Sequence, residues 1–171
     1  MKMMTSAYAN KAIKKLSEDK EYWRNKEREV YIYIAALDEE PVIPDYNYES
    51  VANEIAEIDD KILKIKHAIN LNNATNKIQV GQSMMTIDEI LVKMAQLNNR
   101  KAVLDMMRKQ EPITRVNSGS YSAKKTAPEY QYINYDLELV KNEYERVDEI
   151  IATMQLALDK YNQTFEFEVE I

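Results

Sequence analysis

The chain has no cysteine, two glycines and a single histidine among its 171 residues. Without cysteine it has no disulfide, no thiolate nucleophile and no cysteine metal site. Two glycines cannot form a P-loop or a dinucleotide-binding turn, because both motifs need several backbone positions with no side chain beside the phosphates. One histidine excludes multi-histidine metal sites. Few glycines, four prolines and 30% charged residues are instead typical of long helices joined by few turns.

Long apolar runs are also missing. The longest covers residues 30–37, far fewer than the roughly 20 residues that a helix needs to cross a bilayer. Residues 1–13 lack the continuous apolar core of a secretory signal. We therefore expect a cytoplasmic protein and regard a membrane as an unfavourable partner.

Apolar residues recur at helical spacing through most of the sequence. The most regular stripe alternates steps of four and three and consists of Val51, Ile55, Ile58, Ile62, Ile65 and Ile69, with Asn72 at the next position. Such a stripe predicts a helix that packs against a partner helix. Four stripes predict helices at about 6–38, 48–73, 87–110 and 135–162. The predicted fold is mainly α, with long antiparallel helices in coiled-coil-like packing, small β-hairpins and a C-terminal β-strand.

The segments between the helices contain turn and strand signals. Asn47, Thr86 and Asn134 are placed to cap the second, third and fourth helices. Hairpins are predicted at about 76–86 and 113–133, and a strand at about 164–171. Since a lone strand is unstable, we expect this last one to pair with a hairpin or with another subunit. At this length the whole chain, 1–171, is expected to form a single helical domain.

Charge is unevenly distributed. The net charge is −6, yet residues 93–125 hold eight basic residues against two acidic ones. The acidic whole disfavours general nucleic-acid binding. The basic region could hold a small anionic, nucleotide-like ligand at subunit junctions, because arginines pair with phosphates and tyrosines stack on bases. The candidate residues there are Arg100, Arg108, Arg115, Tyr121 and Tyr132. Alternatively, these charges form a solvated face or attract a second subunit.

A polar cluster follows the second stripe. Asn73, Thr75 and Asn76 are either a helix cap and turn or a hydrogen-bonding lip of a ligand site. His67 has no acidic residue three or four positions away, which favours a surface or interface role over catalysis. No nucleophile motif, cofactor motif or metal motif is found, so we predict a protein that is not an enzyme and holds no cofactor.

Two segments resemble a known family. Residues 69–76, Ile-Asn-Leu-Asn-Asn-Ala-Thr-Asn, and residues 85–91, Met-Thr-Ile-Asp-Glu-Ile-Leu, are similar to the central part of the septicolysin-like proteins. These are small, largely uncharacterised bacterial helical proteins. The similarity extends to residues 115–121 and to a final helix with Asn162 and Thr164. The chain departs from the family at Met94-Ala95, where members often carry an Arg-Asp pair. The resemblance implies long helices with hairpin ends and self-assembly.

Three functions remain open at this point. The first is a homo-oligomeric, non-enzymatic helical assembly or protein-binding module. The second is a binder that sequesters a small anionic, nucleotide-like ligand at subunit junctions, as a phage or bacterial immunity-related protein would. The third is a membrane-perturbing protein, as the name of the septicolysin-like family implies.

Overall fold

A computed structural model describes residues 1–116 and 128–171, so the candidate residue Tyr121 lies outside the described part. Within it the chain is mainly helical, as predicted. The helices are α1 (Ser6–Val30), α2 (Tyr48–Thr75), α3 (Ile87–Arg108) and α4 (Leu137–Thr164). The short strands are β1 (Lys2–Thr5), β2 (Lys77–Val80), β3 (Ser83–Thr86), β4 (Ile113–Arg115), β5 (Tyr130–Tyr132) and β6 (Glu166–Val169).

Contacts divide the chain into two compact units, and the single helical domain expected from the sequence stays a prediction. Unit 1 comprises residues 1–78 and 158–171, and unit 2 comprises residues 79–157. Helix α4 runs from one unit into the other, so each unit is described by itself.

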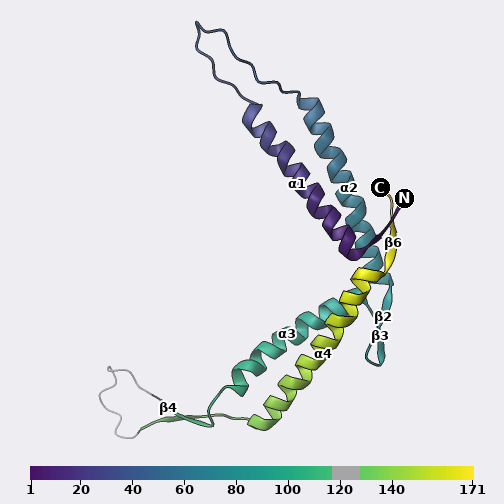
Figure 1. Ribbon diagram of the computed structural model, residues 1–171. Coiled ribbons are helices and arrows are strands. Elements are labelled where there is room, and N and C mark those ends of the chain that lie inside the picture. Colours follow the sequence, from purple (N-terminus) through teal and green to yellow (C-terminus); the bar gives the residue numbers. More distant parts are fainter. Residues whose placement is uncertain (117–127) are drawn as a thin grey trace. The chain divides into compact units, whose positions relative to one another are not determined.

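Unit 1 is built on the antiparallel pair of α1 and α2 (Figure 1). Helix α2 buries every seventh residue, Val51, Ile58 and Ile65, whereas the intervening Ile55 and Ile62 are only half-buried. This is the pattern of one coiled-coil seam shared by two helices, and it confirms the predicted packing.

A small antiparallel sheet of β1 and β6 covers one end of this helix pair, with Met4 opposite Phe167. Met4, Phe167 and Val169 are buried and form a core with Ile65 and Ala9. The prediction that the last strand pairs with a hairpin or another subunit is therefore wrong. Strand β1 has only four residues, too few to show a reliable alternation of apolar and polar side chains.

The first helix is shorter than predicted. It ends at Val30 rather than near residue 38, although the apolar spacing continues through Ile34 and Leu37. Both of these side chains are fully exposed. Residues 31–34, Tyr-Ile-Tyr-Ile, are weak helix formers, and helices of this kind depend on packing for their stability. Without a packing surface for Ile34 and Leu37, the helix stops.

Unit 2 pairs α3 with most of α4. Leu104 packs against Val140 and Val147 in its core. Thr86 and Glu89 form the predicted capping box at the start of α3. The cap of α4 was assigned wrongly to Asn134. The Asp136 carboxylate accepts hydrogen bonds from the backbone N–H groups of residues 138 and 139, a role that requires a position directly before the helix.

Two short ribbons complete the strands of the described chain. Strands β2 and β3 form one, and β4 and β5 form the other. Gly81 lies between β2 and β3 with φ of +58°, the left-handed conformation that a two-residue hairpin loop needs at its first position. Both predicted hairpins are thus present, with Ile113 opposite Tyr132 in the second.

Candidate functional site

Part of the basic region predicted to bind an anion is paired with acidic neighbours. The Arg108 guanidinium lies 4.0 Å from the centre of the Tyr144 ring and 2.7 Å from the Asp105 carboxylate. Lys109 binds the second oxygen of the same carboxylate. These two cations hold the pKa of Asp105 below its usual range, chiefly through the hydrogen bond from Lys109. Arg108 therefore serves the packing of α3 on α4 in unit 2 and is not free to bind a ligand.

Arg100 and Arg115 remain open to solvent. Arg100 is exposed on α3, where it contributes weakly to the low pKa of Glu143, an effect due mainly to the Arg146 hydrogen bond. Arg115 lies on β4 directly opposite Tyr130 of β5. Because alternate residues of a strand share a face, Arg115, Tyr130 and Tyr132 form one exposed face, which we call the ribbon face.

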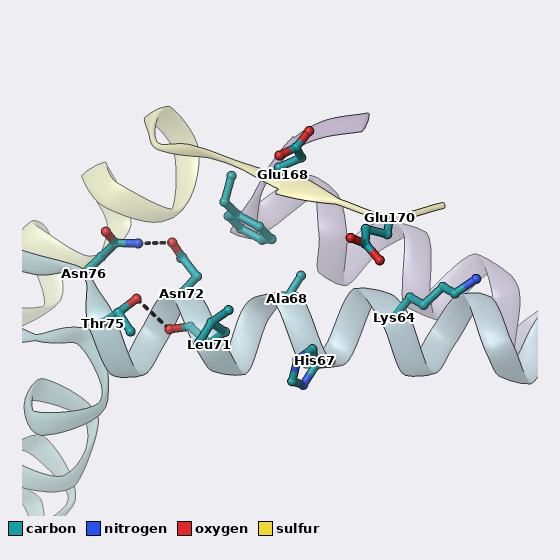
Figure 2. Close-up of a pocket in the computed structure, with 10 residues that line it drawn as sticks. Lys64, His67, Ala68, Leu71, Asn72, Thr75, Asn76, Glu168 and Glu170 are labelled. Atoms are coloured by element: carbon teal, nitrogen blue, oxygen red, sulfur yellow. Dashed lines mark hydrogen bonds between the residues drawn. The ribbon is translucent and has the colours of Figure 1, made fainter. Parts of the chain in front are cut away.

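The predicted polar cluster lies in unit 1, at the end of α2. A pocket of about 430 Å³ lies between α2 and β6. Figure 2 shows Asn72 and Asn76 next to each other at one end of this pocket, with their side-chain amides joined by a hydrogen bond. The pocket, which we call the α2–β6 pocket, is lined by Lys64, His67, Ala68, Leu71, Asn72, Thr75, Asn76, Phe167, Glu168 and Glu170.

Most of the cluster acts as a helix end. The backbone N–H of Asn76 donates to the Asn72 carbonyl and closes the last turn, and the Thr75 hydroxyl donates to the Leu71 carbonyl. Asn73 is half-buried beside them. This confirms the cap prediction, while Thr75 and Asn76 also line the α2–β6 pocket. A ligand-binding role for the three residues stays a prediction.

Asn72 is the residue of this cluster that sequence reasoning did not select. It is 5% exposed, and its amide nitrogen has no hydrogen-bond partner of good geometry within the described residues. The buried Tyr161 hydroxyl is in the same situation. Burial raises the pKa of Tyr161, and the nearby amides of Asn72 and Asn76 lower it to a smaller extent. The signal for Asn72 was its position in the apolar stripe, where an asparagine must be buried.

His67 lies on the wall of the α2–β6 pocket and is exposed. Across the described ranges 1–116 and 128–171 its ring has no hydrogen-bond or ion-pair partner, so no carboxylate orients the ring as a general base would require. In the same ranges, no group of three or more acidic, histidine or cysteine side chains is arranged to hold a metal ion.

Large apolar side chains are exposed on the outer surfaces of both units. Leu63 on α2 and Leu156 on α4 are 66% and 71% exposed. Others lie on α3 and in the segment between α1 and α2, namely Leu91, Val92, Met106, Ile32, Ile34, Leu37, Val42 and Ile43. Single exposed apolar residues are ordinary, whereas contiguous exposed apolar patches are typical of interaction sites.

The predicted site residues do not form one site within a single unit. Asn73, Thr75 and Asn76 belong to unit 1, whereas Arg100, Arg108, Arg115 and Tyr132 belong to unit 2. Within unit 2, the ribbon face brings Arg115 and Tyr132 together, while Arg108 is occupied by Asp105 and Tyr144.

Comparison with known proteins adds information about the fold. No family model and no curated protein matches the sequence. Among solved structures, the chain is similar to a functionally unknown conserved protein from Corynebacterium diphtheriae, with a TM-score of 0.59 and 14% sequence identity. The alignment covers 98% of this chain and 100% of that one. At this identity the similarity establishes a shared fold.

Outside residues 117–127, none of the helices combines enough length with enough hydropathy to cross a bilayer.

Proposed function

We propose that the chain is a non-enzymatic cytoplasmic protein that assembles with copies of itself through the open sides of its helices. The observation that carries the proposal is the repeated exposure of large apolar side chains on helices whose apolar seams are only partly buried. In α2, Ile55 and Ile62 of the seam stay half-buried, and Leu63 outside the seam is exposed. Helices of a second copy packed beside α2 would cover this remaining apolar surface.

The helix α4 repeats the pattern inside unit 2. Val140, Val147 and Met154 are buried at intervals of seven, while Tyr144 and Ile151 between them are half-buried. Each of two independent helix pairs thus leaves part of its apolar surface uncovered. Because partly buried seams occur in both units, they support self-association more strongly than a single exposed region would.

The free energy of burying each side chain determines how many exposed apolar residues a stable association requires. Full burial of a leucine contributes about 1.5–3 kcal/mol, so covering the exposed part of Leu63 or Leu156 contributes about 1–2 kcal/mol. Micromolar affinity needs about 8 kcal/mol net, after the cost of immobilising the partners. Several exposed apolar residues of each copy must therefore be buried together.

Analytical ultracentrifugation of the full chain tests the proposal. We expect a sedimenting mass that is a multiple of 20.0 kDa at micromolar concentration. The double variant Leu63→Ser with Leu156→Ser should weaken association at least about tenfold. A matched control, Asn70→Ser with Asn142→Ser, changes exposed polar residues of the same helices and should associate like the wild type.

Two results would contradict the proposal. One is a wild-type chain that sediments as a 20.0 kDa monomer throughout the micromolar range. The other is equal association of the leucine variant, the control and the wild type, which would show that these helix surfaces do not form the contact.

A second candidate function is the binding of a small anionic, nucleotide-like ligand, and the ribbon face favours it. It places the Arg115 guanidinium beside two exposed tyrosine rings, Tyr130 and Tyr132. Such a group can pair with a phosphate while a ring stacks on a base. Thermal-shift measurements with nucleotides test this: stabilisation should be lost in Arg115→Gln and kept in Lys141→Gln. No stabilisation by any nucleotide would eliminate the candidate.

The resemblance to the septicolysin-like proteins stays a prediction. The cytolytic activity that the family name implies is tested by leakage of dye from liposomes incubated with the purified chain. A chain that causes no leakage would remove this third candidate.

A further inference from the structure

Unit 1 contains a second pocket, which has an apolar floor. It lies between α1, α2 and β1 and has a volume of about 410 Å³, within the usual range for sites of small organic molecules. Its floor is formed by Met4, Ala12, Leu16 and Ile65, and Ile171 lies at its edge. Met4 and Ile65 belong to the core of unit 1, and Ala12 and Leu16 pack against that core, so the apolar part of the lining lies on the core of unit 1.

The rim of this pocket is basic. Lys2, Lys11, Lys15 and Lys61 surround it, and Asp19 is the single acidic residue among the lining side chains. This excess of positive charge is unusual in a chain with a net charge of −6. An apolar floor below a basic rim matches a ligand that has a hydrocarbon part and a negative charge at one end.

Two of these lysines are free for a ligand. In the described part of the chain, Lys11 and Lys15 form no ion pair and no side-chain hydrogen bond. Lys61 has only a long contact of 3.8 Å with Glu57. The cations Arg108 and Lys109 in unit 2 differ, because they share the Asp105 carboxylate.

Tyr8 reports the positive potential at the pocket mouth. Lys2 donates a hydrogen bond of 3.1 Å to its hydroxyl, and this contact is the main reason that the pKa of Tyr8 is lowered. Lys15 and Lys11 lower the pKa of Tyr8 further by their charge. The same field would stabilise a carboxylate placed between these lysines.

We propose that this pocket binds a medium-chain fatty acid, with the hydrocarbon chain on the floor and the carboxylate between Lys11 and Lys15. The lysine stems extend the apolar wall, and their ammonium groups stay at the water boundary. This site belongs to unit 1 alone and does not depend on self-assembly or on the ribbon face.

Isothermal titration calorimetry of the full chain with dodecanoate, below the concentration at which it forms micelles, tests the proposal. One molecule should bind per chain, and affinity should fall by up to about fourfold for each methylene removed in decanoate and octanoate. Dodecyltrimethylammonium has the same tail with a positive head group and should bind much more weakly. Raising the salt concentration should weaken binding of the carboxylate.

The double variant Lys11→Gln with Lys15→Gln should weaken dodecanoate binding about five- to tenfold. The control Lys14→Gln with Lys66→Gln removes one exposed lysine from α1 and one from α2, neither of which lines the pocket, and it should bind like the wild type. All four lysines are exposed or on the rim, so folding should be preserved.

Four outcomes would overturn the proposal. Three of them are no binding of any of the three carboxylates, equal binding of the cationic amphiphile, and equal affinity of the two lysine variants. A chain that binds vesicles of anionic phospholipid but no monomeric carboxylate would also overturn it, because the lysines would then serve a membrane surface.

Discussion

Replacing Asn72 by leucine should raise the free energy of unfolding of unit 1. Asn72 occupies the position in the α2 stripe that follows Val51, Ile58 and Ile65 at intervals of seven, and it is 5% exposed. Its oxygen accepts a hydrogen bond from the Asn76 amide, while its buried amide nitrogen has no good partner within the described residues.

The balance of free energies favours the leucine. The variant Asn72→Leu loses one hydrogen bond, worth about 0.5–1.5 kcal/mol, and removes an unsatisfied buried group that costs about 1–3 kcal/mol. The buried leucine adds about 1.5–3 kcal/mol of transfer free energy, from which about 1–3 kcal/mol of packing strain is subtracted. Asn76 is half-buried, so its amide can turn to water. We expect a net gain of about 1–2 kcal/mol.

Urea denaturation of the wild type and of Asn72→Leu measures this difference, with unchanged m-values as the sign of an intact fold. The companion variant Tyr161→Phe removes a buried hydroxyl that also lacks a good partner and should leave stability nearly unchanged. The reasoning is refuted if Asn72→Leu is less stable than the wild type by about 1 kcal/mol or more. If Tyr161→Phe loses a similar amount, Asn72 and Tyr161 are hydrogen-bonded to each other in solution.

Three further predictions concern pH, a turn and the core of unit 2. The Tyr46 hydroxyl donates a 2.7 Å hydrogen bond to Glu27, which raises the pKa of Tyr46 from 10 to about 12. The stabilising effect of this hydrogen bond should be complete below pH 10 and lost as the pH rises toward 12. Denaturation of Tyr46→Phe should not show this loss of stability, and an identical loss in the variant would refute the prediction. Gly81→Ala should cost roughly 1–2 kcal/mol of stability because Gly81 has a positive φ. An added Cβ meets no atom within 4 Å, so the cost comes from the backbone conformation alone. A thermal midpoint equal to that of the wild type would contradict this prediction. Leu104→Ala, at 1% exposure, should cost about 2–5 kcal/mol in urea. The exposed Asn142→Ser should cost less than about 0.5 kcal/mol, and equal losses in the two variants would disprove the assigned core.

The sequence was sufficient to predict the helices wherever the apolar stripe had a packing partner. Helices α2, α3 and α4 begin and end within about two residues of the predicted positions, the usual scatter of helix ends. The prediction failed beyond Val30, where the spacing continued but the surface to pack against did not. Periodicity describes which side chains share a face, and it carries no information on whether another segment covers that face.

The sheet of β1 and β6 could not be predicted for a different reason. It joins residues 2–5 to residues 166–169, a pairing that depends on where two long helices place their ends. The core that results, from Met4 to Phe167 and Ile65, is invisible to any local pattern. Asp136 differs, because an aspartate directly before the first apolar residue of a helix is a local N-cap signal.

The candidate sites show why charge along the sequence was a weak guide. Between residues 93 and 125 the basic residues are dense, but two of those on α3, Arg108 and Lys109, pair with an acid three or four residues away, Asp105. The lysine-rimmed pocket of unit 1 draws Lys2, Lys11 and Lys61 from three elements, β1, α1 and α2. Charge density along the sequence therefore does not distinguish cations that pair with neighbouring acids from cations that line a pocket. We therefore expect anions to bind at the lysine-rimmed pocket of unit 1 in preference to the paired cations Arg108 and Lys109 of unit 2.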